Sequence, residues 1–260
     1  MNLGLKGKVA LITGASQGIG LAIARRLADE GMAIALCARS AERLNSLANE
    51  IATGGGQALA YPADLREPDA PAAFASAARS QFGRIDVVVN NAGATRRGDF
   101  LTLGEADWAD GYALKFFGAV RLCRAVWPDL MATHGNIINI AGVGGRTGSA
   151  EFTIGGSVNA ALLNLTKCLA DRGVTDHVRV NAINPGYIRT DRLALRIQRL
   201  AAEKGISEKS AAEQIAQGVG IHRFGLPEEI AAMVAFLAGA PAAYCQGAII
   251  DIDGGMTRTL

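Results

Sequence analysis

Short apolar runs alternate with longer stretches of helical periodicity along most of this 260-residue chain. The apolar runs predict strands at Val9–Thr13, Ala33–Ala38, Ala58–Tyr61, Val87–Asn90, Ile137–Ala141, Val178–Ile183 and Ala248–Ile252. The intervening stretches predict helices at Ile19–Glu30, Ala41–Thr53, Asp69–Phe82, Glu105–Met131, Ser157–Arg172 and Pro227–Leu237. Apolar strands that alternate with amphipathic helices are typical of a parallel sheet covered on both faces. We therefore expect a single α/β domain over residues 1–260, with a doubly wound, seven-stranded parallel sheet.

A polar helical insert, residues 191–217, follows the sixth predicted strand. In an open α/β sheet such an insert lies beyond the carboxyl ends of the strands, where ligands bind. We expect it to be a substrate-covering lid, and the alternative is ordinary surface structure.

The composition supports one substantial core: 50% of the residues are apolar, 19% are charged, and the net charge is only +2. No basic stripe indicates nucleic-acid binding, and no apolar run approaches the roughly 20 residues that span a bilayer. The first strand begins so early that no signal peptide is expected, and the four cysteines are scattered. We expect reduced thiols, no metal site and a cytoplasmic protein.

A glycine-rich turn links the first predicted strand to the first predicted helix. Its residues include Gly14, Ser16, Gln17, Gly18, Ile19 and Gly20. Glycine allows a tight bend and the close approach of a pyrophosphate, while the helix N-terminus supplies free N–H groups. The strand–turn–helix context therefore predicts a dinucleotide site.

Further motifs extend this prediction along almost the whole chain: Asp64-Leu65, Asn90-Asn91-Ala92-Gly93, Asn184-Pro185-Gly186 and Asp253-Gly254-Gly255. Their order and spacing resemble the short-chain dehydrogenase/reductase family, which implies a Rossmann-type fold. The resemblance implies that Asp64 bonds the adenine amino group and that Leu65 backs the ring. It also implies that Asn91, Ala92 and Gly93 line the adenosine ribose, although Asn91 could equally tie two strands together. Ile188 and Thr190, after Pro185-Gly186, would hold the nicotinamide carboxamide.

The end of the second strand, Cys37-Ala38-Arg39-Ser40, carries no carboxylate. An acidic residue there would bond a ribose 2′-hydroxyl, whereas the Arg39 guanidinium suits a 2′-phosphate. We therefore expect NADP(H) in preference to NAD(H). The alternative is that Arg39 is an ordinary solvent-facing arginine.

The catalytic positions depart from the family pattern. Family enzymes use an Asn, a Ser and a Tyr-x-x-x-Lys pair. The flanking motifs place Lys115 at the asparagine position, Gly142 at the serine position, Gly155 at the tyrosine position and Asn159 at the lysine position. The usual proton donor is therefore expected to be missing, an effect of about 10²–10⁴-fold in rate.

Lysine and asparagine are exchanged at two of these positions, so Lys115 could reach toward the site that Asn159 vacates. The alternative is that Lys115 is a helix-surface lysine. Tyr187 is the tyrosine nearest the expected nicotinamide, and packing against the cofactor is favoured over proton donation. Arg146 and Glu151 could bind a polar substrate, although such loop charges are more often solvated.

The sequence favours an NADP(H)-dependent oxidoreductase acting on a carbonyl or hydroxyl substrate through tentative catalytic residues Lys115, Asn159 and Tyr187. One alternative is a cofactor-binding sensor or partner subunit without dehydrogenase activity, and another is a non-redox enzyme on the same fold. A small-molecule substrate is expected, without nucleic-acid or membrane partners. The segments Leu114–Trp127 and Leu162–Leu169 carry more apolar residues than one buried helix face needs. This excess favours a homotetramer, or at least a homodimer.

Overall fold

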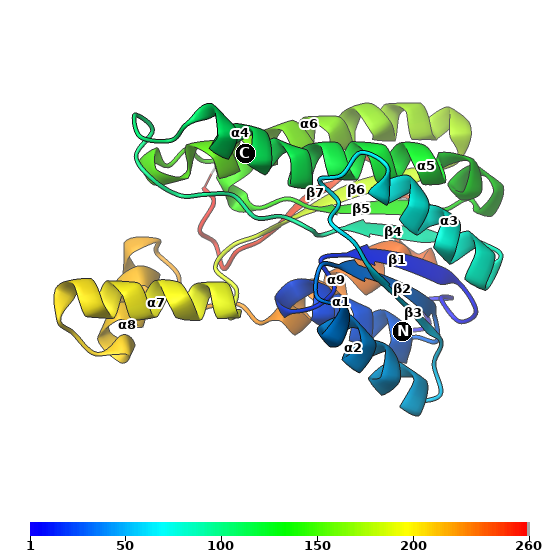
Figure 1. Cartoon of the computed structure of the whole chain (residues 1–260), viewed down its shortest axis with the longest axis horizontal. Helices are drawn as coiled ribbons and strands as arrows, with labels where there is room; N and C mark the ends of the chain where they lie inside the picture. The colour runs from blue at the N-terminus through cyan, green and yellow to red at the C-terminus, as the bar shows by residue number, and fades with distance from the viewer. Residues whose placement is uncertain (259–260) are drawn as a thin grey trace.

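The computed structural model describes residues 1–258, which build one seven-stranded parallel sheet of order β3-β2-β1-β4-β5-β6-β7 (Figure 1). The strands are β1 (Val9–Thr13), β2 (Ala33–Ala38), β3 (Ala58–Pro62), β4 (Val87–Asn90), β5 (Asn136–Ile140), β6 (Arg179–Pro185) and β7 (Ile249–Ile252). The strand order reverses between β1 and β4, and open α/β sheets bind ligands in the crevice at such a point. The predicted doubly wound fold is confirmed.

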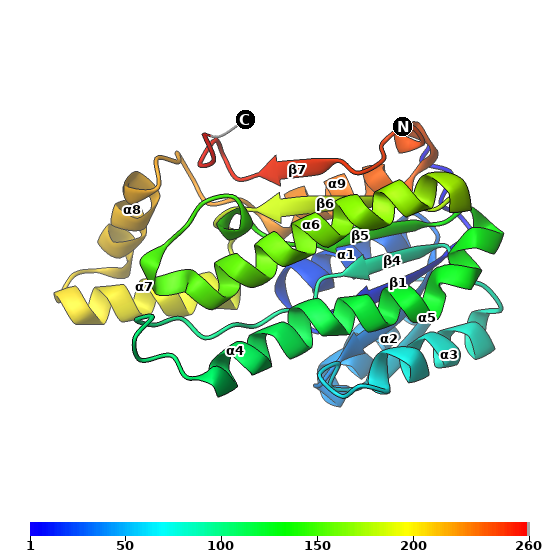
Figure 2. The ribbon, with the colours of Figure 1, turned by 90° about the horizontal axis from the view of Figure 1, so that it is seen from above.

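Helices cover both faces of the sheet (Figures 1 and 2). One face carries α1 (Gly18–Asp29), α2 (Ala41–Thr53) and α9 (Pro227–Ala238). The other carries α3 (Ala70–Phe82), α5 (Gly118–Thr133) and α6 (Thr153–Asp176). Helix α4 (Glu105–Tyr112) leads into α5.

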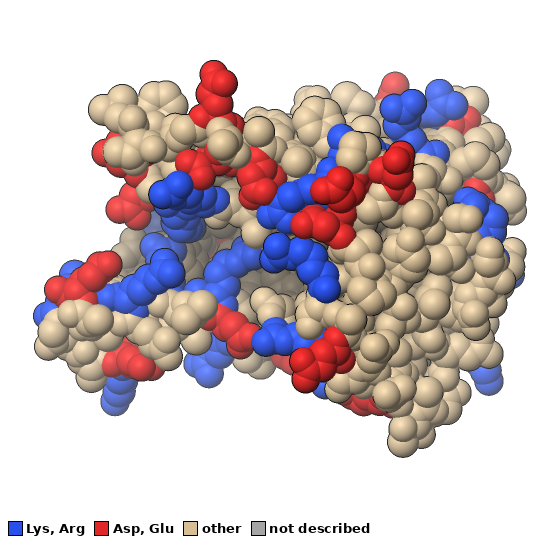
Figure 3. Space-filling view, in the orientation of Figure 1, with Lys and Arg blue, Asp and Glu red and all other residues tan. Residues whose placement is uncertain are grey.

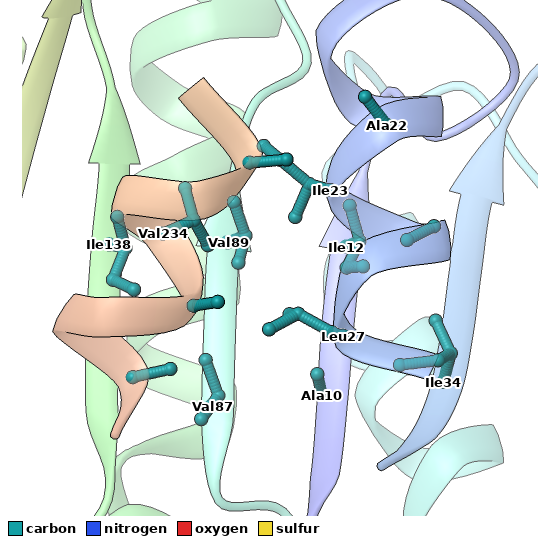
Figure 4. Close-up of a cluster of buried hydrophobic side chains, with 14 of the residues drawn as sticks. Ala10, Ile12, Ala22, Ile23, Leu27, Ile34, Val87, Val89, Ile138 and Val234 are labelled. Carbon is teal, nitrogen blue, oxygen red and sulfur yellow. The ribbon is translucent and has the colours of Figure 1, made fainter. Parts of the chain in front are cut away.

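The inner strands are mostly apolar because both of their faces are buried, and buried polar residues such as Asn139 and Asn181 form side-chain hydrogen bonds. Ala10 and Ile12 of β1 join the cluster under α1 and α9 (Figure 4), whereas Val9 and Leu11 join the cluster under α3 and α5. Successive side chains of a strand point to opposite faces, so one short apolar run contributes to both cores.

The predicted helix Glu105–Met131 is wrong as a continuous α-helix. It is interrupted by a π-helical turn, Ala113–Phe117, between α4 and α5. Such a turn inserts one residue and shifts the faces of the helix, and it is frequent at functional sites. The predicted start of the next helix at Ser157 is also wrong, because α6 begins at Thr153.

The insert after β6 forms α7 (Asp191–Lys204) and α8 (Glu208–Gly218), which project beyond the carboxyl ends of the strands (Figures 1 and 2). A small apolar cluster of its own holds this arm together, formed by Leu193, Ile215, Ile221 and Phe224. Within residues 1–258, no helix is long and apolar enough to cross a membrane.

Candidate active site

The glycine-rich turn after β1 is packed so closely that side chains are excluded from it. A Cβ atom on Gly20 would lie 2.2 Å from the Gly14 carbonyl oxygen, and Gly14 itself has a φ of +67°. Gln17 begins α1 without placing a side-chain hydrogen bond on the first turn. The N–H groups there are therefore open to an anion such as a pyrophosphate.

Asn91 holds this turn against the end of β4. Its Nδ2 donates to the carbonyl oxygens of Thr13 at 3.0 Å and Gly14 at 3.1 Å. The backbone N–H groups of Asn91 and Ala92 both donate to Thr13 Oγ1. Asn91 therefore ties the ends of β1 and β4 together, which is the structural alternative for this residue. These hydrogen bonds hold the backbone beside the expected ribose site in place.

Two arginines lie at the end of β2, of which the sequence analysis named only Arg39. Arg39 is exposed. Ser40 caps α2 by accepting the Arg43 N–H, and the Arg43 guanidinium donates to Gln17 Oε1 beside the glycine-rich turn. Arg43 was not predicted from the sequence as a cofactor-binding residue. The signal was the serine N-cap, which places the third residue after it in the first turn of the helix, beside Arg39.

Asp64 and Leu65 follow β3 as the motif predicts. Leu65 is buried, while Asp64 pairs with Arg66 at 3.2 Å. Burial raises the Asp64 pKa, but hydrogen bonds from Arg66 and the positive charges of Arg66 and Arg39 outweigh it and hold the pKa below its usual value. Asp64 is therefore an ionised acceptor at this edge of the sheet.

The segment after β6 returns to the glycine-rich turn. Gly186 donates its N–H to Ile252 at 3.0 Å, and Ile188 is buried. Thr190 precedes α7, and its Cγ2 would lie 3.1 Å from a Cβ atom on Gly18. The sequence-predicted cofactor segments, including Pro185 and Ile19, thus come from the carboxyl side of the sheet and the start of α1.

Lys115 points inward from the π-helical turn. Its Nζ donates to the Ala141 carbonyl oxygen at 2.6 Å, directly after β5. Gly93 covers its stem so closely that a Cβ atom there would lie 2.8 Å from Lys115 Cδ. Burial lowers the Lys115 pKa to about 7, with a further contribution from the positive charge of Arg192. Lys115 is therefore not the helix-surface lysine of the alternative interpretation.

Gly142 and Asn159 lie beside this lysine contact. Gly142 has a φ of +145°, a conformation that side chains rarely adopt, and a Cβ atom there would lie 3.0 Å from Asn159 Nδ2. Asn159 is buried, and its Oδ1 has no hydrogen-bond partner among the described residues. A buried amide oxygen without a partner is costly and marks a place where a ligand hydroxyl can bind.

The ring of Phe152 fills the space over Gly155. A Cβ atom on Gly155 would lie 2.1 Å from Phe152 Cζ, and one on Gly144 would lie 2.9 Å from Phe152 Cε1. The Arg97 guanidinium stacks on the same ring, 4.2 Å from its centroid. Phe152 and Arg97 were not predicted from the sequence. A signal for Phe152 was present, because Gly144 and Gly155 on either side of it along the chain leave room for its ring.

Tyr187 belongs to the base of the α7–α8 arm. Its hydroxyl accepts a hydrogen bond from Arg196, and its ring packs against Phe224 at a centroid distance of 6.4 Å. Arg146 forms an ion pair with Asp251 at 3.5 Å. The Lys115 ammonium and Asn159 are thus brought together around Gly142, while Tyr187 packs on α7.

Comparisons with known proteins identify the family to which this fold belongs. The sequence profile of a family described as enoyl-(acyl carrier protein) reductase matches residues 14–257. The short-chain reductase protein NovJ of Streptomyces niveus is 36% identical, with 95% of this chain and 93% of that protein covered. A 3-oxoacyl-[acyl-carrier-protein] reductase of Synechocystis is also 36% identical, with 97% and 98% covered. The chain belongs to the short-chain dehydrogenase/reductase family and is a short-chain oxidoreductase.

Solved structures show the same likeness. L-sorbose reductase from Gluconobacter frateurii, complexed with NADPH and L-sorbose, has a TM-score of 0.96, 36% identity and full coverage of both chains (100% each). An actinorhodin polyketide ketoreductase with NADPH has a TM-score of 0.91 and 31% identity, covering 97% of this chain and 98% of its own.

Proposed function

We propose that this protein is an NADP(H)-dependent oxidoreductase of a carbonyl or hydroxyl substrate, in which Lys115 replaces the usual tyrosine as proton donor. One observation carries the proposal: the Lys115 amine is buried at the Ala141 carbonyl, next to the glycine that stands at the serine position. A small-molecule substrate is part of the proposal.

The residues present fit NADP(H). The uncapped N-terminus of α1 suits the pyrophosphate, and Arg39 with Arg43 suits the 2′-phosphate. The unpartnered Oδ1 of Asn159 would accept a hydrogen bond from a ribose hydroxyl. Two neighbours in structure are bound to NADPH, which supports the preference over NAD(H). When bound, the nicotinamide supplies or accepts the hydride.

Lys115 carries the proton in this proposal. With a pKa of about 7, its ammonium and amine forms are both populated near neutral pH, as general acid–base work requires. The ammonium donates a proton to the substrate carbonyl oxygen during reduction, and the amine accepts one from the hydroxyl during oxidation. The Ala141 carbonyl oxygen holds the amine in place between turns of the reaction.

The proposal extends to the rest of the molecule. Residues 1–260 form a single domain, and residues 191–217 act as a substrate lid, supported by the arm that α7 and α8 form beside the site. Thr190 and Arg192 at its base reach the cofactor turn and Gly93. Assembly as a homotetramer or homodimer in the cytoplasm completes the proposal.

A second candidate is a cofactor-binding protein without dehydrogenase activity. The observation that favours it is the ring of Phe152 over Gly155, together with the backbone of Gly142, because neither position offers a hydroxyl group. In that case Lys115 would only bind electron-rich groups.

The deciding experiment measures NADPH binding by calorimetry and then NADPH oxidation with a broad panel of carbonyl compounds. The proposal expects binding and turnover in the wild type, and turnover lost in Lys115→Ala. Lys167→Ala, which removes an exposed lysine from α6, is the matched control and should behave as wild type. NADPH binding without turnover of any compound would favour the second candidate.

A further inference from the structure

Three arginines meet on the side of the site that faces the α7–α8 arm. Arg97 lies in the segment after β4, whereas Arg192 and Arg196 lie four residues apart on α7 and therefore share one helix face. We call these three residues the arginine cluster. Figure 3 shows Lys and Arg side chains bordering the recess between this arm and the rest of the molecule.

Neutral groups hold the arginine cluster in place. Arg192 donates to the Gly93 carbonyl oxygen at 2.8 Å. Arg196 donates to the Tyr187 hydroxyl, and Arg97 stacks on Phe152. In the part of the chain that the structure describes, none of the three forms an ion pair with a carboxylate. Their side chains are thus fixed while their charges are left without a direct counter-ion.

These charges lie close enough to disfavour one another. Partial burial lowers the Arg97 pKa, and Arg196 and Arg192 lower it further, although Tyr187 and the exposed Glu151 oppose them. Arg192 also lowers the pKa of Lys115. An anion bound among these cations would relieve the repulsion between them.

The arginine cluster borders the expected catalytic positions. Arg192 binds the carbonyl of Gly93, whose Cα packs on the Lys115 stem, and Arg97 covers the ring that fills the tyrosine position. The arginines suited to a 2′-phosphate, Arg39 and Arg43, lie at β2 on the other side of β1. The cluster is therefore separate from the expected 2′-phosphate site.

We propose that the substrate carries an oxyanionic group, a carboxylate or a phosphate, which the arginine cluster binds beside the carbonyl that reacts at Lys115. This inference rests on the proposed function and names its substrate class. Guanidinium groups match both anions because their N–H donors bind two oxygens at once. The fixed positions of Arg97 and Arg196 make the site selective for an anion over a neutral analogue of similar size.

The test is a calorimetric titration of the whole chain saturated with NADP⁺, so that no ketone is reduced during binding. Two matched pairs serve as probes at constant ionic strength: acetoacetate with methyl acetoacetate, and dihydroxyacetone phosphate with dihydroxyacetone. If NADP⁺ does not bind, the chain alone is titrated. The double variant Arg97→Gln/Arg196→Gln removes two cluster charges, and Lys209→Gln removes an exposed charge of the same arm on α8 as the control.

We expect at least one anion to bind about tenfold or more tightly than its neutral partner. The double variant should lose this preference and Lys209→Gln should keep it. The pair that shows the effect identifies carboxylate or phosphate as the source. The inference is overturned if neither anion binds at millimolar concentrations, or if the preference survives in the double variant. Anion preference without NADPH oxidation would support the anion site while refuting the reductase proposal. Turnover of neutral carbonyl compounds without anion preference would support the reductase proposal and refute the anion site.

Discussion

At the scale of single residues, Lys115 shows how position changes the chemistry of a side chain. The inserted residue of the π-helical turn directs it inward, and burial then lowers its pKa to about 7. The same lysine on an exposed helix face would remain a permanent cation with no catalytic use.

The first prediction concerns the pH dependence of the reaction. Carbonyl reduction should be fast below about pH 7 and fall above it, because the ammonium form of Lys115 is the donor. Alcohol oxidation should show the opposite trend. Initial rates across pH in both directions test this, and Lys115→Ala should lower the rate about 10²–10⁴-fold and abolish the profile. A wild-type profile that is flat through neutrality would count against Lys115.

The second prediction concerns stability, which is independent of turnover. The Lys115 pKa is about 7 in the folded chain against 10.5 for an unperturbed lysine, so between these pH values the unfolded chain binds one more proton. The free energy of unfolding should therefore rise as pH increases from about 7. Below that pH Lys115 is charged in both states, and burial of the charge destabilises the folded state. Denaturant titrations of wild type and Lys115→Met should show this rise in wild type only. An identical pH dependence in both would show that the amine is not buried in solution.

The third prediction concerns cofactor choice. Arg39→Ala and Arg43→Ala should each weaken NADPH binding about tenfold or more, because a charge-assisted contact to the 2′-phosphate is lost. NADH binding should stay unchanged, and Arg199→Ala should affect neither cofactor. Calorimetry with both reduced cofactors measures this. Equal wild-type affinities that neither variant alters would refute the NADP(H) preference.

At the scale of elements, the start of α6 and the loop before it act as one packed unit. The short helical turn Ala150–Phe152 places Phe152 against Gly144 and Gly155, so two glycines and one ring replace the larger side chains of the family pattern. The Phe152 ring therefore fills the space of the missing tyrosine side chain, but it does not replace the tyrosine hydroxyl.

The fourth prediction follows from this packing. Gly155→Tyr alone should lower the melting temperature, because its Cβ would meet Phe152 at 2.1 Å and overpacking typically costs about 1–3 kcal/mol. The double variant Phe152→Gly/Gly155→Tyr should recover much of that loss. Thermal unfolding of both variants and of Phe152→Gly is the measurement. Adding Gly142→Ser should destabilise either background, because φ at this residue is +145°. A Gly155→Tyr variant as stable as wild type would show that the ring does not occupy this space.

At the scale of the whole molecule, α5 and α6 present a partly apolar groove on the outside of the layer. Its lining residues are Val120, Cys123, Arg124, Trp127, Leu165, Leu169 and Arg172. Cys123, Trp127 and Leu169 of this lining also pack on the core beneath the helices, so the groove is only partly outside the packing on the sheet.

The fifth prediction is that this groove joins two copies of the chain. Light scattering should show a homotetramer or homodimer at micromolar concentration, and Leu165→Asp/Leu169→Asp should dissociate it, because a charge is costly in an apolar interface. Leu195→Asp, at an exposed leucine on α7, is the control. A monomeric wild type would contradict the prediction.

The sequence by itself determined the sheet and the cofactor frame. Strands such as Val9–Thr13 are buried on both faces, so a continuous apolar run is sufficient evidence for them. Gly14 and Gly20 lie within one short motif, and their spacing fixes their contact because a strand, a turn and a helix start are local structures. The hydrogen bond of Asn91 to Gly14, by contrast, joins residues 77 positions apart. The family membership follows from the same local order.

Only the tertiary structure decided the character of the candidate catalytic site. Phe152 meets Gly144 and Gly155 from a separate turn of the chain. Arg97, Arg192 and Arg196 come from a loop and a helix and are close enough for their charges to interact. The direction of Lys115 depends on one π-helical turn, which hydrophobic periodicity does not reveal. Side-chain periodicity reports which face of an element is buried, whereas a site built at strand ends depends on distances between elements that only the folded chain sets.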